Sequence, residues 1–287
     1  MNDESPPHPD RRLHSRVTEA MTEADMIRVA QRIRTTAGIV LDAQKRQMVV
    51  ARLGRRLRTL GMTRFRDYLD YLDHAGDPAE AQHFVNTLTT NLTFFFREPH
   101  HFEHFDREVL APPGKVPPPA LRLWSAGCSS GEEPYSLGLT VLQRLGHVPA
   151  DTRILATDID TDMLQIARAG SYRIDQCERI PARLRTRHLT RSENGAAVQM
   201  PAALGRAISF AQLNLLDRWP ISVKFHAIFC RNTLIYFDHD TKAALVDRFA
   251  AALHPGGYLY LGHSESLLNP HPLLESCGST IYRRRTE

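Results

Sequence analysis

The sequence predicts an α/β fold, in which a doubly wound parallel sheet follows an all-α N-terminal domain. Two observations support this prediction. From residue 121 onward, apolar runs typical of buried strands alternate with helical patterns, and the first run leads through a glycine-containing loop into a helix. Residues 21–90 instead show helical periodicity, with cap signals at helix starts and ends.

The composition is that of a globular protein with one large or two modest domains. The chain has 287 residues, of which 42% are hydrophobic, and none of its apolar runs is long enough to span a bilayer. The polar N-terminus has no apolar signal region, so we expect a cytoplasmic protein without membrane insertion. Four cysteines without metal-ligand spacing predict reduced thiols and no metal. The net charge of +4 is mild for a nucleic-acid binder.

The first 90 residues divide into a tail and a helical domain. Residues 1–20 contain little apolar material, and we expect a disordered tail. Four helices are predicted after it. Thr22 and Asp25 have the spacing of a capping box at the first helix, and Asp77 and Glu80 have it at the fourth.

The second helix, predicted from about residue 42 to residue 60, is rich in arginine. Its leucines form a buried face, and the basic side chains at positions 45, 52 and 56 share a face away from them. Such a stripe indicates an acidic partner, either protein or nucleic acid, although an ordinary solvated face has the same pattern. The candidate substrate-binding residues are Lys45, Arg46, Arg52, Arg55 and Arg56.

Residues 91–120 are predicted to link the helical domain to the sheet and to contact a ligand. Three adjacent phenylalanines, Phe94–Phe96, cannot all face one core, so at least one is expected to pack against a ligand or the neighbouring domain. Asn91, Thr93 and Arg97 are the polar groups of this apolar setting. The end of the segment is rich in proline and predicts a stiff connector into the first strand.

The segment Trp124–Ser136 combines a strand end, a tight glycine loop and a helix start. Gly127 and Gly131 let a ligand approach the backbone closely. Glu132 and Glu133 lie at the helix start, where they would repel a phosphate and favour a cation. S-adenosylmethionine (SAM) has a sulfonium, an ammonium and no phosphate, and therefore fits this loop better than NAD or ATP. The alternative is that both glutamates merely complement the helix dipole.

Polar residues follow the later strands, at the carboxyl edge where open α/β sheets bind ligands. Asp158 ends the second strand and is expected to bind ribose hydroxyls. Asn214 follows the third strand, and its amide can both donate to and accept from an adenine edge. Arg231 and Asn232 end the fourth strand and are placed to touch cofactor or substrate.

Residues 171–207 interrupt the alternation of strands and helices. They are rich in arginine and turn formers and have only short apolar pairs, so we expect a small inserted antiparallel β-subdomain over about residues 175–207. After it, Pro255-Gly256-Gly257 predicts a turn into a fifth strand, Tyr258–Gly262, and Thr280–Tyr282 predicts a last strand at the sheet edge.

Five segments in this order resemble the CheR family of chemotaxis receptor methyltransferases. Each segment alone is a weak signal, but together they extend over nearly the whole chain after the tail. They are Asn91–Arg97, Ser125–Ser136, Thr157–Asp160, Cys230–Phe237 and Gly262–Glu265.

This resemblance implies a class I SAM-dependent methyltransferase domain with a Rossmann-like sheet and a β insertion, here residues 121–287. It also implies methyl transfer from SAM to glutamate side chains of a chemoreceptor, with S-adenosylhomocysteine as product. The partner would be the helical bundle of the receptor's cytoplasmic part, with no nucleic acid, and we expect a monomer. With the loop glycine, the expected cofactor-binding residues are Asn91, Thr93, Arg97, Gly127, Glu132, Asp158, Asn214, Leu215, Arg231 and Asn232.

One stretch departs from the family pattern. Members that dock on a receptor's C-terminal pentapeptide carry a turn of the form Arg-Gly-x-Gly-x-x-x-Gly in the insertion. Residues 190–196 have a shorter stretch with only Gly195. We therefore expect recognition that does not depend on the pentapeptide.

The expected reaction needs alignment rather than a general base, because a glutamate is already ionised at neutral pH. Arg97 is the catalytic candidate for orienting the carboxylate, since a guanidinium matches it as a fork. Tyr236 is a second candidate, and its alternative role is that of a core aromatic.

Two other functions remain open at this point. One is a nucleic-acid methyltransferase, against which residues 231–234 argue, because they lack an Asn/Asp-Pro-Pro-aromatic loop. The other is a non-catalytic regulatory module that senses SAM.

Overall fold

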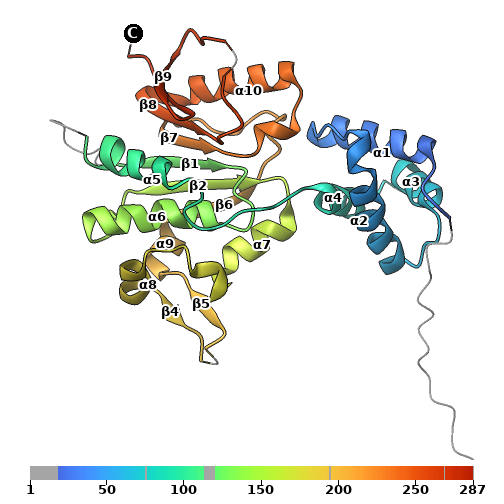
Figure 1. Cartoon of the computed structure of the whole chain (residues 1–287), viewed down its shortest axis with the longest axis horizontal. Helices are drawn as coiled ribbons and strands as arrows, with labels where there is room; N and C mark the ends of the chain where they lie inside the picture. Colours follow the sequence, from blue (N-terminus) through green and yellow to red (C-terminus); the bar gives the residue numbers. More distant parts are fainter. Residues whose placement is uncertain (1–18, 75, 113–119, 194, 268, 287) are drawn as a thin grey trace, which may run out of the picture. The chain divides into compact units, whose positions relative to one another are not determined.

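The computed structural model describes residues 19–74, 76–112, 120–193, 195–267 and 269–286 (Figure 1). These residues form two compact units. The first holds the residues up to Ile33 together with Leu41–Leu88, and the second holds Arg34–Val40 together with the residues from Thr89 onward. Most of the predicted tail and of the proline-rich connector lies outside the described residues. No helix among the described residues is both long and apolar enough to cross a membrane.

The first unit is helical, as predicted. The capping box at its start is confirmed: Asp25 donates its N–H to Thr22 Oγ1 at 3.1 Å, and Thr22 donates its N–H to Asp25 Oδ2 at 2.9 Å. Leu53 and Leu57 of the second helix are fully buried. The helices are α1 (Glu23–Ala37), which continues into the second unit, η1 (Ala43–Lys45), α2 (Arg46–Thr59), α3 (Phe65–His74) and α4 (Pro78–Leu88).

The predicted role of Glu80 as a helix cap is wrong. Asp77 does accept an N–H at the start of α4, from Ala79 at 2.9 Å. The carboxylate of Glu80 instead points into the helical unit, where it is buried and accepts from Arg56 Nε at 3.0 Å and from the Tyr68 hydroxyl at 2.8 Å. A buried charge needs such partners, and the ion pair with Arg56 of α2 compensates for the burial of the Glu80 carboxylate better than a bond to the helix start would.

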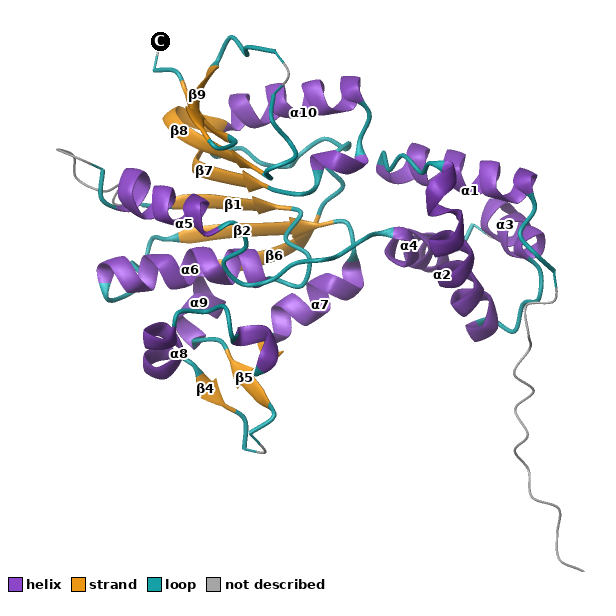
Figure 2. Ribbon diagram, in the orientation of Figure 1, coloured by secondary structure: helices purple, strands orange, loops and turns teal. Residues whose placement is uncertain are grey.

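The second unit is built on a seven-stranded sheet of order β6-β2-β1-β7-β8-β10-β9 (Figure 2). The first five strands in this order are parallel, and β10 is antiparallel to both of its neighbours. The large-sheet strands are β1 (Arg122–Ala126), β2 (Arg153–Asp158), β6 (Ile208–Gln212), β7 (Phe225–Cys230), β8 (Leu253–Leu261), β9 (Leu274–Gly278) and β10 (Ile281–Arg284).

Side chains of the central strands alternate between two hydrophobic cores, one on each face of the sheet. Leu123 and Phe229 belong to one core, and their neighbours Trp124 and Ile228 belong to the other. This alternation is the expected consequence of the pleat, and it explains why these strands are apolar throughout. The helices are α5 (Pro99–Phe105) with its continuation η2 (Asp106–Leu110), α6 (Glu132–Leu145), α7 (Thr161–Ala169), η4 (Leu234–Tyr236) and α10 (His239–Ala252).

The end of the sheet differs from the prediction. The strand predicted at the edge, β10, lies between β8 and β9, so β9 forms the edge. The sequence of β9, Leu-Glu-Ser-Cys-Gly, buries only Leu274 and therefore has no apolar run to reveal it. β8 begins at Leu253, so Pro255-Gly256-Gly257 lies within the strand rather than in a turn, and the pairing with β7 shifts register there.

The inserted subdomain contains a three-stranded antiparallel sheet of order β3-β5-β4, apart from the large sheet in Figure 2. Its first strand precedes the predicted start near residue 175. The turn between β4 and β5 is short, and Gly195 donates its N–H to the Ser192 carbonyl at 2.8 Å. The elements are β3 (Ser171–Arg173), η3 (Asp175–Cys177), α8 (Ala182–His188), β4 (Thr190–Arg191), β5 (Ala197–Gln199) and α9 (Ala202–Ala207).

Candidate active site

The polar residues singled out in the second unit gather at the carboxyl ends of the parallel strands. Because β1, β2, β6 and β7 run in the same direction, the loops that follow them meet at one edge (Figure 1). Residues 89–98 lie against the same edge, as the Ser129 hydroxyl donates to the Asn91 carbonyl at 3.2 Å. The edge therefore combines five chain segments that are far apart in the sequence.

The two loop glycines are needed for packing inside the protein. Gly127 has a φ of +88°, and a Cβ there would lie 2.3 Å from Thr233 Oγ1 in the loop after β7. Gly131 has a φ of +97°, and a Cβ there would lie 2.7 Å from the Tyr172 hydroxyl. The missing side chains thus allow neighbouring loops to pack closely, in addition to the predicted approach of a ligand.

Asp158 ends β2, as predicted, and its carboxylate is buried. Oδ2 accepts the N–H of Ser129 at 2.7 Å, and Oδ1 accepts the N–H of Asp160 at 2.9 Å. Burial raises the pKa of Asp158 to about 6, against the lowering effect of these hydrogen bonds. A backbone hydrogen bond from Ile159 lowers the pKa as well, and the carboxylate, which only accepts when ionised, is suited to a hydroxyl donor.

Asp160 joins the start of α7 to the segment before β1. As predicted, it caps α7, accepting the N–H groups of Asp162 and Met163 at 3.0 and 3.2 Å. Its other oxygen accepts from the Thr89 hydroxyl at 2.6 Å and from the Asn91 amide at 2.7 Å. The side chain of Asn91 is therefore held toward α7, and Thr89 is a site residue that the sequence did not reveal.

The adjacent glutamates of the loop have different partners. Glu132 accepts from the Ser130 hydroxyl at 2.7 Å, and burial raises its pKa. Glu133 accepts from the Ser125 hydroxyl at 2.7 Å and from Arg231 Nη1 at 3.1 Å. Glu133 is therefore the counterion of a buried arginine, whereas Glu132 has no cationic hydrogen-bond partner among the described residues.

Arg231 lies in a buried network that the sequence only partly predicted. Its guanidinium pairs with Glu133 and, at 3.4 Å, with Glu98 Oε2, and it also donates to the Arg97 carbonyl. The Arg231 Nε is buried and has no hydrogen-bond partner in the described part of the chain. Glu98 was assigned no role from the sequence, and Glu133 was expected to favour a cationic ligand rather than to pair with Arg231, since nothing in their local spacing indicates a distant arginine.

A second unassigned carboxylate shapes the loop after β7. Glu265 is buried and accepts three backbone N–H groups, from Gly262 at 2.6 Å, Asn232 at 2.7 Å and Ile235 at 3.1 Å. Asn232 has a φ of +56°, which is uncommon for a residue with a side chain. Glu265 belongs to the Gly262–Glu265 segment of the family resemblance, and the structure gives it a specific position.

Both catalytic candidates bond to the backbone of residues 90–92. Arg97 Nη1 donates to the Leu92 carbonyl at 2.7 Å, and its guanidinium lies 5.6 Å from the ring centre of Phe94. The Tyr236 hydroxyl donates to the Thr90 carbonyl at 3.3 Å, and the residue is only partly buried. Tyr236 is therefore not a core aromatic, while the catalytic roles of both residues stay predictions.

The remaining predicted cofactor residues are placed differently. Asn214 donates to the Thr36 carbonyl at 2.8 Å and accepts the N–H of Leu216 at 3.1 Å, so both ends of its amide already have partners. Leu215 is buried in the second hydrophobic core, and Thr93 is partly exposed. Each end of this amide can make one further hydrogen bond, and the contact of Asn214 with adenine stays a prediction.

The basic residues of α2 and η1 have unequal exposure. Arg56 is bonded to the buried Glu80, and Arg46 pairs with Glu23 at 3.1 Å. Lys45 and Arg52 are partly buried, the latter reaching the Thr87 carbonyl at 3.5 Å, whereas Arg55 is exposed. Arg58, on the same helix, is exposed as well. The predicted stripe therefore includes a structural ion pair.

Comparisons with known proteins agree with this geometry. A family model described as "CheR methyltransferase, SAM binding domain" matches residues 91–283, and "CheR methyltransferase, all-alpha domain" matches residues 24–89. "Chemotaxis protein methyltransferase 2" of Pseudomonas aeruginosa is 41% identical over 264 residues, which cover 91% of this chain and 93% of the relative. "Chemotaxis protein methyltransferase" of Escherichia coli is 40% identical over 266 residues, covering 92% and 91%.

Among solved structures, an S-adenosylmethionine dependent methyltransferase from Mesorhizobium loti aligns with 50% of this chain and 46% of its own. The identity is 20% and the TM-score is 0.28, so this alignment carries no argument beyond the family matches.

Proposed function

We propose, from the premise that this chain belongs to the CheR methyltransferase family, that it forms methyl esters on glutamate side chains of chemoreceptors. The family itself establishes a SAM-dependent methyltransferase of chemotaxis. One observation supports the finer proposal. Buried carboxylates at the strand ends, Glu132 and Asp158, suit a cationic donor without phosphate, whereas the partly exposed guanidinium of Arg97 suits an anionic acceptor.

The residues at this edge fit SAM. The ionised carboxylate of Asp158 suits ribose hydroxyls, and the buried Nε of Arg231, which has no partner among the described residues, suits a carboxylate such as that of the methionine part. Glu132 lies at the start of α6 without a cationic hydrogen-bond partner and suits the ammonium. When bound, SAM supplies a methyl group on a sulfonium. Asn91, Thr93, Asn232 and the loop at Gly127 complete the proposed site.

The reaction requires little chemistry from the protein. A glutamate with an ordinary pKa is ionised at neutral pH and needs no general base, so the protein only has to hold it in line with the methyl group that bound SAM would supply, with a neutral thioether as the leaving group. Burial raises the pKa of the nearby Cys128 thiol far above its usual range, which argues against a thiolate intermediate. The residues act by alignment and by excluding water from the ion pair that reacts.

Arg97 and Tyr236 are proposed to position the acceptor. The Arg97 guanidinium has donors beyond the one it gives to Leu92, and these can hold the incoming carboxylate as a fork. The Tyr236 hydroxyl donates a hydrogen bond to the Thr90 carbonyl, which keeps it beside the segment that carries Arg97. We further propose that the substrate is a helical bundle with exposed glutamates. The enzyme would act as a monomer and without nucleic acid.

The proposal is tested with tritiated SAM and purified receptor cytoplasmic fragments. We expect label that is released by mild base, as methyl esters are, and that maps to glutamates. Base-stable label, or the absence of label on the receptor while S-adenosylhomocysteine still binds, would contradict glutamate methylation without contradicting the family.

A further inference from the structure

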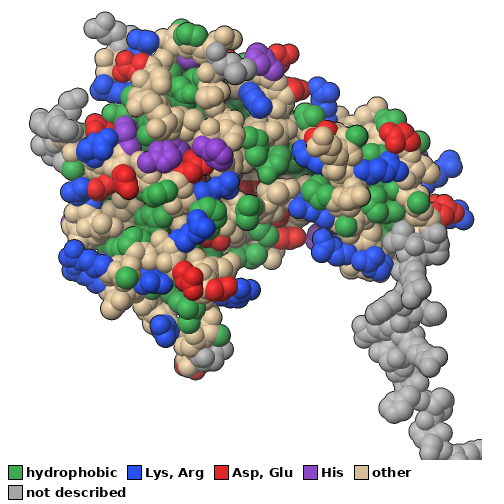
Figure 3. Space-filling model, in the orientation of Figure 1, with side chains coloured by type: hydrophobic (Ala, Val, Ile, Leu, Met, Phe, Trp, Pro, Cys, Tyr) green, Lys and Arg blue, Asp and Glu red, His purple; other side chains and the backbone are tan. Residues whose placement is uncertain are grey.

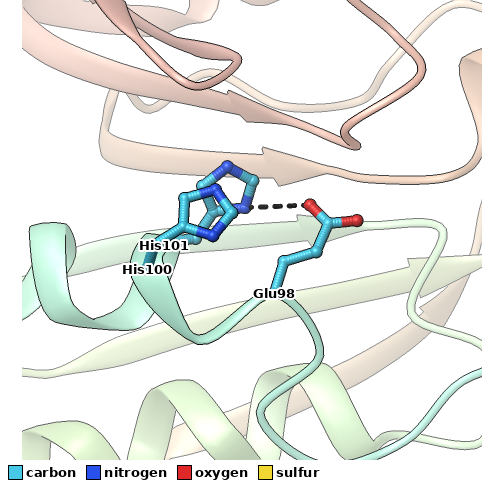
Figure 4. A group of neighbouring side chains, drawn as sticks. All are labelled: Glu98, His100 and His101. Atoms are coloured by element: carbon cyan, nitrogen blue, oxygen red, sulfur yellow. Dashed lines mark ion pairs between the residues drawn. The ribbon is translucent and has the colours of Figure 1, made fainter.

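Histidine side chains gather on the displayed face of the second unit (Figure 3). Three histidines, His100, His101 and His263, lie around Glu98. Potential ligand atoms of Glu98, His100 and His101 all lie within 4.8 Å of one another (Figure 4). His263 Nδ1 adds a further imidazole, 3.2 Å from Glu98 Oε1. We propose that Glu98, His100 and His101 form a site for a divalent transition metal such as Zn²⁺.

The first argument is the orientation of the His101 ring. This side chain is fully buried, and its Nε2 lies 3.1 Å from the carbonyl oxygen of Ser279. A carbonyl only accepts, so Nε2 carries the proton and Nδ1 carries a lone pair. Metal-binding histidines usually have this arrangement, with one nitrogen donating to a carbonyl and the other facing the ion.

The second argument is that two acceptor atoms face each other with no donor between them, although Arg231 Nη2 lies 3.4 Å from one of them, Glu98 Oε2. His101 Nδ1 and Glu98 Oε2 are 3.4 Å apart, and neither has a hydrogen-bond partner within the described residues. Two ligands of a tetrahedral zinc ion, each about 2.0–2.2 Å from the metal, are separated by about 3.4 Å. The two atoms therefore already have the spacing of neighbouring zinc ligands.

The third argument is the charge of the surroundings. Glu98 and Glu133 both contact Arg231, so the buried group has one carboxylate more than it has guanidinium ions. A bound cation would neutralise this excess while Glu133 continues to pair with Arg231. Arg231 also borders Glu98 Oε2, so it competes with the metal, and we expect binding weaker than that of a structural zinc site.

The backbone at Glu98 supports a specific placement of its carboxylate. Glu98 precedes the first turn of α5 with φ and ψ of 56° and 70°, in the left-handed region that is uncommon for a residue with a side chain. Figure 4 shows the carboxylate beside the rings of the two histidines that follow in the sequence.

The test is calorimetric titration of the chelator-treated full chain with ZnCl₂ near neutral pH, with its thiols blocked. We expect one ion to bind, and His100→Ala, at a partly exposed position, to weaken binding by at least about tenfold. Glu98→Gln should weaken it at least as much. His239→Ala is the matched control, because His239 is an exposed histidine beside a carboxylate, 3.3 Å from Asp240.

Cobalt(II) gives a second readout that does not depend on enzyme activity. The wild-type protein should show the visible absorption of a low-symmetry nitrogen and oxygen site, and His100→Ala should lose it. Absence of zinc binding, or binding that is unchanged in both His100→Ala and Glu98→Gln, would overturn the proposal and leave the proposed methyl transfer unaffected.

Discussion

Ser129 donates its backbone N–H to the buried carboxylate of Asp158 at 2.7 Å, and this bond ties the glycine loop after β1 to the end of β2. Ser129 has a φ of +48°, so the loop adopts an uncommon conformation where it makes the bond. Because burial raises the pKa of Asp158 to about 6, the charge of this junction changes just below neutral pH. Two predictions for pH dependence follow from this group.

The affinity for S-adenosylhomocysteine should fall as the pH is lowered through about 6. Only the ionised form of Asp158 offers acceptors to both ribose hydroxyls, so affinity should decline by up to about tenfold for each pH unit below its pKa. Asp158→Asn should bind at least about tenfold more weakly above that pH and should lack this dependence. Calorimetry across the range decides, and an identical pH profile in the variant would exclude Asp158 as a ribose ligand.

The stability of the cofactor-free protein should change in the opposite sense. The pKa of Asp158 in the folded state, about 6, is above its ordinary value of 3.8, so the folded protein binds this proton more tightly than the unfolded chain does. The stabilisation is complete below the ordinary pKa and is lost as pH rises through about 6. The free energies of unfolding of the wild type and of Asp158→Asn, measured with denaturant, should therefore diverge as the pH rises from about 4 to about 6. If both free energies change equally with pH, the prediction is wrong.

Glu265 should be required for the shape of the loop that holds Asn232. Glu265→Ala leaves three N–H groups without this acceptor, one of them buried and two partly buried, and a buried unsatisfied group costs about 1–3 kcal/mol, so we expect about 2 kcal/mol of lost stability. We also expect Glu265→Ala to lose cofactor affinity, because the loop holds Asn232. Glu265→Gln keeps an acceptor oxygen and should retain more of this affinity than Glu265→Ala does. Ser264→Ala, at the exposed neighbour, is the control. Thermal unfolding with and without S-adenosylhomocysteine measures both effects, and a fully stable Glu265→Ala would exclude this role.

Much of the fold was predictable because its signals are local. Strands β1, β2 and β7 are apolar runs, and Asp160 caps α7 as its position before a helical pattern indicates. The elements that were not predicted, β9 and α8, lack such signals. β9 buries a single leucine, and α8 buries only Leu184, so neither has a periodic pattern to detect.

The partners of polar side chains were less predictable than their positions. Asp158 and Arg231 were expected at the carboxyl edge, and they lie there. Glu80 has the spacing of a cap, but it bonds to Arg56, which is 24 residues away. A carboxylate forms the pair that best compensates its burial, and sequence spacing cannot show which distant residue supplies it.

Arg97 should affect methyl transfer more than cofactor binding. If its guanidinium orients the acceptor, Arg97→Ala should lower the methylation rate by at least about tenfold at saturating SAM, because a positioning interaction is removed. S-adenosylhomocysteine affinity should change by much less. Arg97→Lys keeps the charge without the fork and should recover only part of the rate. Equal losses of rate and affinity would make Arg97 a cofactor residue, as the family resemblance also allows.

The last prediction concerns how a receptor is recognised. The stretch at residues 190–196 has only Gly195 where the family's pentapeptide-docking turn has several glycines, so we predict that the basic residues of the helical unit recognise the receptor. The exposure of each basic residue decides whether it can be substituted without unfolding the protein. Arg56→Glu would leave the buried Glu80 unpaired, at a cost of about 3–5 kcal/mol, and its loss of activity would report unfolding.

Arg55 and Arg58 are exposed on the same helix and test the surface itself. Single exposed ion pairs contribute about 0.2–1 kcal/mol, so Arg55→Glu with Arg58→Glu should reduce methylation several-fold, chiefly at low salt. Thermal stability and S-adenosylhomocysteine binding should not change. Arg66→Glu, a charge reversal at an exposed position of α3, is the matched control. A receptor fragment that lacks its C-terminus should remain a full substrate if, as we propose, the contacts are made with its helical bundle. Loss of methylation on that truncation, or equal activity of the double variant and the wild type at low salt, would show that recognition lies elsewhere.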